Sequence, residues 1–276
     1  MTIDMSTTRT DLALESVQAA CSGAETGTIS GVRSRERTRE GYAVTDIRVE
    51  DEDGAQALGK PVGRYVTVDL GPYFRREADY FDRGVRCLAG ELAALLPEGP
   101  VLAAGLGNRA MTCDAVGPAS IDNLLVTRHM IRAMPRQFAD FRPVAAVCPG
   151  VLARTGLEAL ELVRGAVERV RPAAVIAVAA RDSARLCATV QLSDTGLVPG
   201  SGVGNRRSAL DRGTLGVPVI AVGIPTVVDA DPRAGLFLTP RDIDQRIREL
   251  GRLLGYGITL ALQPSLTAAD VTALLG

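Results

Sequence analysis

The sequence contains no tryptophan and a single histidine, and aromatic residues make up only 4% of its 276 residues. Proteins that bind nucleic acid usually combine a basic face with aromatic or arginine-rich contacts, whereas the formal net charge here is -1. No apolar run approaches the ~20 residues of a membrane-spanning helix. The N-terminus lacks the basic segment and apolar core of a secretory signal. We therefore expect a cytoplasmic protein that binds neither nucleic acid nor a membrane directly.

Cysteine and histidine are too few, and too widely spaced, for the common metal centres. The five cysteines form no Cys-x-x-Cys pair, and their odd number favours free thiols in a reducing compartment. The single histidine, His129, rules out a multi-histidine zinc site and leaves any Ser-His-Asp or Cys-His triad dependent on one residue. We expect His129 to pack or hydrogen-bond within a helix. We expect no metal and no cofactor.

Strand-like and helix-like segments alternate through most of the chain. From about residue 77 to residue 276 this alternation predicts a three-layer α/β/α sandwich with a mostly parallel sheet. Residues 26–70 instead show alternating apolar and polar positions around a turn, which predicts a small antiparallel β appendage near the N-terminus. With 46% hydrophobic residues, the chain can bury one substantial core.

Residues 101–129 carry the first candidate site. An apolar run predicts a buried strand, glycines at 105 and 107 predict a turn, and a polar loop containing Asp114 then leads into an amphipathic helical pattern. Open α/β sheets place their sites at the carboxyl ends of parallel strands. Asp114 is therefore the first candidate functional residue, although an aspartate near a helix start is often only a cap.

The same stretch permits a nucleotide-binding alternative. Residues 105–110 fit the loose dinucleotide fingerprint Gly-x-Gly-x-x-Ala. That fingerprint also requires an acidic residue about 20 positions on, after a second strand, and none occurs there. In addition, the carboxylate of Asp114 would repel a pyrophosphate. We therefore favour a hydrolytic site over a nucleotide site.

Hydrolysis of a peptide without a metal, serine or cysteine requires two carboxyl groups, one to take a proton from water and one to polarise or protonate the amide. Asp114 is the first. Asp182, just past a strand predicted to end at Val178, and Asp194 are the nearest candidates for the second. The local pattern does not choose between them.

Several further segments carry recognisable motifs, at residues 9–13, 63–67, 105–108, 114–118, 123–129, 149–151, 191–205 and 223–230. In this order they resemble the germination proteases of spore-forming bacteria, a family of atypical aspartic-type endopeptidases. The Gly-x-Gly-Asn and Asp-x-x-Gly elements also resemble those of hydrogenase maturation endopeptidases, which implies a phosphorylase/hydrolase-like α/β/α fold.

The resemblance implies a substrate, a form of synthesis and a location. Family members degrade small acid-soluble spore proteins during germination and are made in the forespore as tetrameric zymogens that cut themselves near the N-terminus. The matching bond here joins Asp11 to Leu12, so residues 1–11 would be a propeptide and residues 12–276 a single peptidase domain. The expected partners are spore proteins as substrates and three further copies of the chain in a homotetramer. The expected location is the spore core.

The sequence departs from the family pattern at one place that bears on catalytic activity. Where the family reads Asp-Ala-Leu-Ala-Ala-Arg after the strand, Val178 is followed directly by Ala179, Ala180 and Arg181, so the second active-site aspartate is missing. Asp182 is a weak candidate to replace it, or else an ordinary surface loop residue. The sequence thus leaves two interpretations: a peptidase with impaired activity, or an inactive member that binds spore proteins or co-assembles with active subunits.

Overall fold

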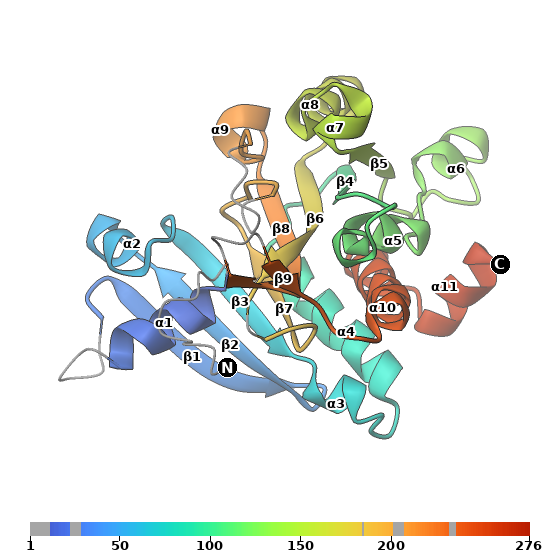
Figure 1. Ribbon diagram of the computed structural model, residues 1–276. Helices are drawn as coiled ribbons and strands as arrows, with labels where there is room; N and C mark the ends of the chain where they lie inside the picture. The colour runs from blue at the N-terminus through green and yellow to red at the C-terminus, as the bar shows by residue number, and fades with distance from the viewer. Residues whose placement is uncertain (1–11, 23–28, 184, 201–206, 232–235) are drawn as a thin grey trace.

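The computed structural model describes residues 12–22, 29–183, 185–200, 207–231 and 236–276. Within these ranges the strands form one nine-stranded sheet flanked by helices (Figure 1). The strands are β1 (Val32–Arg39), β2 (Tyr42–Val49), β3 (Gly63–Asp69), β4 (Val101–Leu106), β5 (Val144–Gly150), β6 (Ala174–Asp182), β7 (Thr189–Ser193), β8 (Val219–Asp231) and β9 (Leu236–Leu238). The helices are α1 (Ala13–Ser22), α2 (Glu52–Leu58), α3 (Gly71–Phe74), α4 (Tyr80–Ala93), α5 (Val116–Asp122), α6 (Arg128–Ala133), α7 (Leu152–Thr155), α8 (Ala159–Val170), α9 (Arg212–Leu215), α10 (Ile243–Leu262) and α11 (Ala268–Leu275).

The sheet has a parallel part and an antiparallel part. Its order is β1-β2-β3-β7-β8-β6-β4-β5, with β9 paired to β8. Strands β5, β4, β6 and β8 run parallel, whereas β1, β2, β3 and β7 are antiparallel to their neighbours. The antiparallel strands expected from residues 26–70 continue the main sheet, because β3 pairs with β7. They are its extension rather than a separate sheet.

Helices cover both faces of the sheet, which confirms the α/β sandwich. Helices α4, α5 and α10 pack on one face, against alternate strand residues such as Ala103 and Val178. The intervening strand residues face α8 and α9 on the other side. Helices α1 and α2 cover the antiparallel end of that second face. Successive side chains of a strand point to opposite faces of the sheet, so alternate residues contact different helices. Because these parallel strands are covered on both faces, they are apolar at nearly every position.

The chain after β4 forms two short helices where the sequence pattern suggested one. Leu124 and Leu125 remain buried between α5 and α6, but the helix is interrupted. The Thr127 hydroxyl accepts a hydrogen bond from the Val144 backbone and donates one to the Arg142 carbonyl. These bonds tie the connection to the start of β5. His129 lies exposed on α6, so the expected packing role is wrong.

Candidate active site

Asp114 lies in the loop that follows β4, at the carboxyl end of the parallel strands. A short 3₁₀ turn, Thr112–Asp114, carries it. Its Oδ2 accepts a hydrogen bond from the backbone N–H of Asn108 at 2.8 Å. Gly107, the residue before Asn108, has a φ of +125°, and a Cβ at this position would lie 2.0 Å from the Asp114 carbonyl oxygen. Only glycine allows the loop to fold back closely enough for this bond.

The same loop is held against the sheet by helix α5. At Gly117, in its first turn, a Cβ would meet the carbonyl oxygens of Leu106 at 2.2 Å and Val178 at 2.5 Å. The helix backbone therefore rests directly on the ends of β4 and β6. From β4 the chain continues to β5 on one side, while β6 lies on the other. Such a switch point leaves a crevice outside the strand ends, and Asp114 stands at it.

Replacement of Gly107 by alanine should disrupt this loop. The positive φ and the contact with the Asp114 carbonyl both oppose a side chain, so we expect a loss of about 2–4 kcal/mol in the free energy of unfolding. Gly165 is the matched control, because it lies exposed on α8 and a Cβ there would meet nothing within 4 Å. Gly165→Ala should be neutral or slightly stabilising. Urea unfolding of both variants checks this, and equal stabilities would contradict the role of Gly107.

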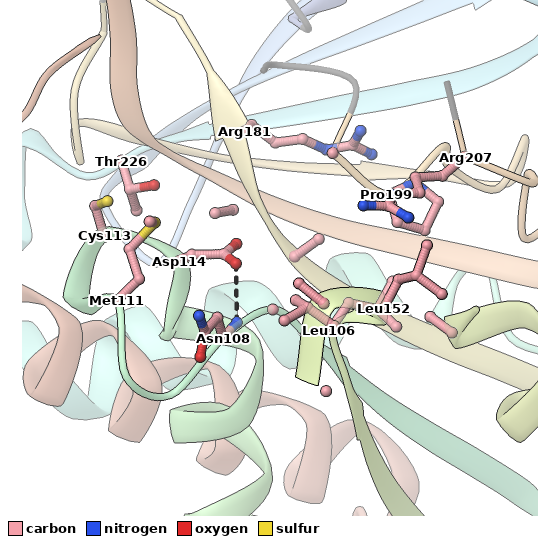
Figure 2. A pocket seen from close by; sticks show the side chains of 18 of the residues that line it. Leu106, Asn108, Met111, Cys113, Asp114, Leu152, Arg181, Pro199, Arg207 and Thr226 are labelled. Atoms are coloured by element: carbon pink, nitrogen blue, oxygen red, sulfur yellow. Dashed lines mark hydrogen bonds between the residues drawn. The ribbon is translucent and has the colours of Figure 1, made fainter. Parts of the chain in front are cut away.

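Asp114 opens onto a cavity of about 560 Å³ (Figure 2). Most of its wall is apolar and includes Leu106, Met111, Leu152 and, from β9, Phe237. The charged residues among the described lining are Asp114, Arg181 and Arg207. A cavity of this size and character, with a few polar groups, is typical of a binding site.

Burial changes the acidity of Asp114. Loss of hydration raises the pKa of its carboxyl group to about 6, although the hydrogen bond from Asn108 favours the ionised form. A carboxyl group with this pKa is ionised at neutral pH yet basic enough to take a proton from water, as general base catalysis requires.

Cys113 and Thr226 also line the cavity. Burial is the largest cause that raises the pKa of the Cys113 thiol, which opposes the thiolate form that nucleophilic catalysis needs. The hydroxyl of Thr226 is fully buried, and among the described residues it has no hydrogen-bond partner. It can therefore donate a hydrogen bond to a ligand in the cavity. His129 does not line the cavity, so a Cys-His pair is not assembled there.

Neither candidate partner of Asp114 is among the described residues that line its cavity. Asp182 is the last residue of β6, pairs in register with Val227 and is 0% exposed, so it is not a surface loop residue. It is not among the residues that line the cavity. Asp194 is exposed and accepts a hydrogen bond from the Arg64 backbone at 2.8 Å, which ties it to β3.

The expected processing site lies at the edge of the described chain. Asp11 is outside the described residues, whereas Leu12 and Ala13 are 0% exposed. The Ala13 backbone N–H donates a hydrogen bond to Oε1 of Gln191, on β7, at 2.7 Å. The segment that follows the expected bond is thus bound in a buried position on the sheet.

Sequence reasoning missed Arg181 and Thr226 as cavity residues. The only available signal was their position, since each follows a predicted buried strand. Across the described residues, no three His, Cys, Asp or Glu side chains are grouped to hold a metal ion. No helix in the same ranges combines the length and apolar character needed to cross a membrane.

The sequence comparisons agree on one family. A family model described as germination protease matches residues 9–234. The chain is 39% identical to the germination protease of Caldanaerobacter subterraneus subsp. tengcongensis, over 97% of this chain and 98% of that protein. It is 36% identical to the germination protease of Clostridium perfringens, with the same shares covered. It is 37% identical to that of Priestia megaterium, over 95% of this chain and 76% of that protein.

A solved structure is also similar. The NiFe hydrogenase maturation protease HycI from Thermococcus kodakarensis KOD1 matches with a TM-score of 0.40 and 17% sequence identity. The match covers 63% of this chain and 99% of that one.

Proposed function

Because this chain belongs to the germination protease family, we propose that it is an aspartic-type endopeptidase that degrades small acid-soluble spore proteins during germination. The observation that carries the proposal is the position of Asp114, which lies at the wall of a largely apolar cavity with its pKa raised to about 6. An extended substrate segment fits such a cavity, and the carboxylate faces it.

In the proposed reaction, Asp114 takes a proton from a water molecule as the water oxygen attacks the carbonyl carbon of the scissile bond. The protonated Asp114 then gives that proton to the amide nitrogen as the carbon–nitrogen bond breaks. The products are a free carboxyl group and a free amine, and the carboxylate of Asp114 is restored. One carboxyl group can thus serve as base and then as acid.

The missing second carboxylate limits this chemistry. Asp114 is the only acidic residue among the described residues that line the cavity, so we propose that hydrolysis is slower than with a pair of carboxyl groups. The same observation favours a second candidate function: an inactive member that binds spore proteins or co-assembles with active subunits.

We further propose that the protein is a zymogen of the spore core, assembled as a homotetramer and cut between Asp11 and Leu12. The buried position of Leu12 and the hydrogen bond of Ala13 to Gln191 support a domain that begins at residue 12. Residues 1–11 would be the propeptide.

Incubation of the purified protein with a small acid-soluble spore protein separates the two functions. A ladder of fragments on a gel, absent with Asp114→Asn, supports the peptidase. Co-elution of the two proteins in gel filtration without any fragment supports the binding function and contradicts the peptidase. Mass spectrometry of the incubated chain shows whether a new N-terminus appears at Leu12.

A further inference from the structure

Thr226 is the extra residue of a β-bulge in the second half of β8. In the ladder between β6 and β8, Pro225 pairs with Arg181. The next residue of β6, Asp182, pairs with Val227, so Thr226 has no counterpart in this ladder. Proline cannot donate a backbone hydrogen bond, which favours an interruption of the ladder here. Bulges beside binding sites redirect a side chain that a regular strand would point elsewhere.

The backbone of this bulge is tied to other parts of the chain. The carbonyl oxygens of Pro225 and Val227 accept hydrogen bonds, at 2.6 and 3.2 Å, from backbone N–H groups in the connection between β6 and β7. The Thr226 carbonyl oxygen accepts a hydrogen bond from the Thr239 hydroxyl at 2.8 Å. Each of the three residues is held by its own bond, so the backbone gives the side chain of Thr226 a defined position.

The hydroxyl of Thr226 is unused within the free protein. Thr226 is fully buried, and its Oγ1 has no hydrogen-bond partner among the described residues. A buried polar group without a partner is destabilising and rare in folded proteins. Thr67 and Thr189 share this property, but neither is among the described residues that line the cavity. The bulge and the cavity therefore distinguish Thr226 from the other two threonines.

Thr226 and Asp114 belong to the same cavity. Both residues line it, and Figure 2 shows Thr226 on the side where Cys113 and Asp114 lie. The turn Thr112–Asp114 contacts β8 as well as β6, so a substrate amide beside Asp114 also lies beside the strand that carries Thr226. Most of the wall is apolar, and a hydrogen bond to developing negative charge is strongest where water is excluded.

We propose that the Thr226 hydroxyl donates a hydrogen bond to the carbonyl oxygen of the peptide bond that is cut. The assignment rests on the peptidase function proposed above. Because Thr226 forms part of the wall, rotation about its Cα–Cβ bond turns the hydroxyl toward a bound amide. Thr226 then supplies the polarising interaction for which a second carboxyl group is missing.

The hydrogen bond acts on the charge that forms during the reaction. As the water oxygen attacks the carbonyl carbon, one electron pair of the carbon–oxygen double bond moves to the carbonyl oxygen. Thr226 stabilises that negative charge and keeps its own proton. When the electron pair returns, the carbon–nitrogen bond breaks and Asp114 supplies the proton to the nitrogen. The interaction is stronger in the transition state than with the bound substrate, so it acts on kcat.

The test compares three variants with the unmodified protein in the cleavage of a small acid-soluble spore protein. Thr226→Val keeps nearly the same shape but removes the hydroxyl, so kcat should fall by about 10²-fold with little change in KM. Thr226→Ser keeps the hydroxyl and should retain most of the activity. Thr189→Val is the matched control, because it removes an equally buried and unpartnered hydroxyl outside the described lining of the cavity. Its kcat and KM should be unchanged.

Thermal unfolding of the same variants separates loss of the hydroxyl from damage to the fold. Since neither hydroxyl has a partner, both valine variants should melt at the same temperature as the unmodified protein or a few degrees higher. A lower melting temperature in Thr226→Val would show that its hydroxyl already has a structural role and would overturn the proposal. So would an unchanged kcat in Thr226→Val, an equal loss in Thr226→Ser, or an equal loss in Thr189→Val.

Binding measurements separate failure of this assignment from failure of the peptidase function. If spore proteins are cut equally fast by the unmodified protein and Thr226→Val, the peptidase function stands and only the assignment of Thr226 fails. If the unmodified protein cuts no spore protein, the peptidase function fails, and the affinity for the uncut spore protein is compared instead. Binding about 5- to 10-fold weaker in Thr226→Val, but not in Thr189→Val, would retain Thr226 as a donor to a bound carbonyl group. Equal or absent binding would overturn that role as well.

Discussion

Replacement of Asp114 by asparagine is expected to lower kcat/KM for cleavage of spore proteins by about 10²- to 10⁴-fold, the usual contribution of a general base. Asparagine has nearly the same shape, and its carbonyl oxygen can still accept the hydrogen bond from Asn108. The loop should therefore stay in place while the base is lost. Asp122→Asn is the control, because Asp122 is exposed on α5 and pairs with Arg109. Equal activities of the two variants would remove Asp114 from the mechanism.

The pH dependence of cleavage by the unmodified protein tests whether Asp114 acts as the general base. With the pKa of Asp114 at about 6, the fraction of active carboxylate rises with pH through that value. We therefore expect kcat/KM to rise with a midpoint near pH 6 and to level off above pH 7. A rate that falls over this range would assign Asp114 the role of the acid rather than the base.

The Asp114→Asn substitution should also stabilise the folded protein at neutral pH. In the unfolded chain an aspartate has a pKa of about 3.9, so the folded state binds the proton of Asp114 more tightly. The stability that this proton provides is complete below the unfolded pKa and is lost as pH rises through about 6. Asparagine is neutral throughout. In thermal unfolding, the Asp114→Asn variant should melt a few degrees above the unmodified protein at pH 7.5 and at nearly the same temperature at pH 4. The same difference in melting temperature at both pH values would contradict the raised pKa of Asp114.

The position of Asp114 in the fold could be predicted from the sequence because it follows from local rules. A run of apolar residues that ends in Gly-x-Gly predicts a buried strand and a turn, and the carboxyl ends of parallel strands are where such folds form their crevices. Predicting the position of Asp114 required no knowledge of tertiary contacts beyond this rule. Strand β4 and the loop around Gly107 occur where this pattern places them.

The surroundings of Asp114 could not be predicted in the same way. The sequence pattern predicts that strand β6 ends at Val178. Pairing with a long β8 continues β6 through Asp182, which becomes fully buried. Nor does the local pattern show that the stem of Arg181 crosses Gly223, a residue about 40 positions away that lies on another strand. Contacts of this kind depend on sheet register, which no local pattern encodes.

Restoring a second carboxylate should increase activity if its absence limits the reaction. Ala180 is half-buried, lies on β6 two residues after Val178 and lines the cavity with Asp114. The turn that carries Asp114 contacts β6, so Ala180→Asp introduces a second carboxyl group into the lining of the same cavity. We expect kcat/KM to rise by about 10²-fold or more, because the new group can polarise or protonate the amide while Asp114 activates water.

Three comparisons show whether such a gain comes from a pair of carboxyl groups. Ala180→Asn, which adds the same bulk without a titrating group, should show no increase. Combining Ala180→Asp with Asp114→Asn should remove the gain, since Asp114 is the group that activates water. Two nearby carboxyl groups share a proton, so one ionises at lower pH and the other at higher pH. The rate should consequently change from a single rise near pH 6 to a bell-shaped profile. A folded Ala180→Asp protein with unchanged kcat/KM would show that the missing carboxylate does not limit hydrolysis, and would leave the binding function as the better account of the cavity.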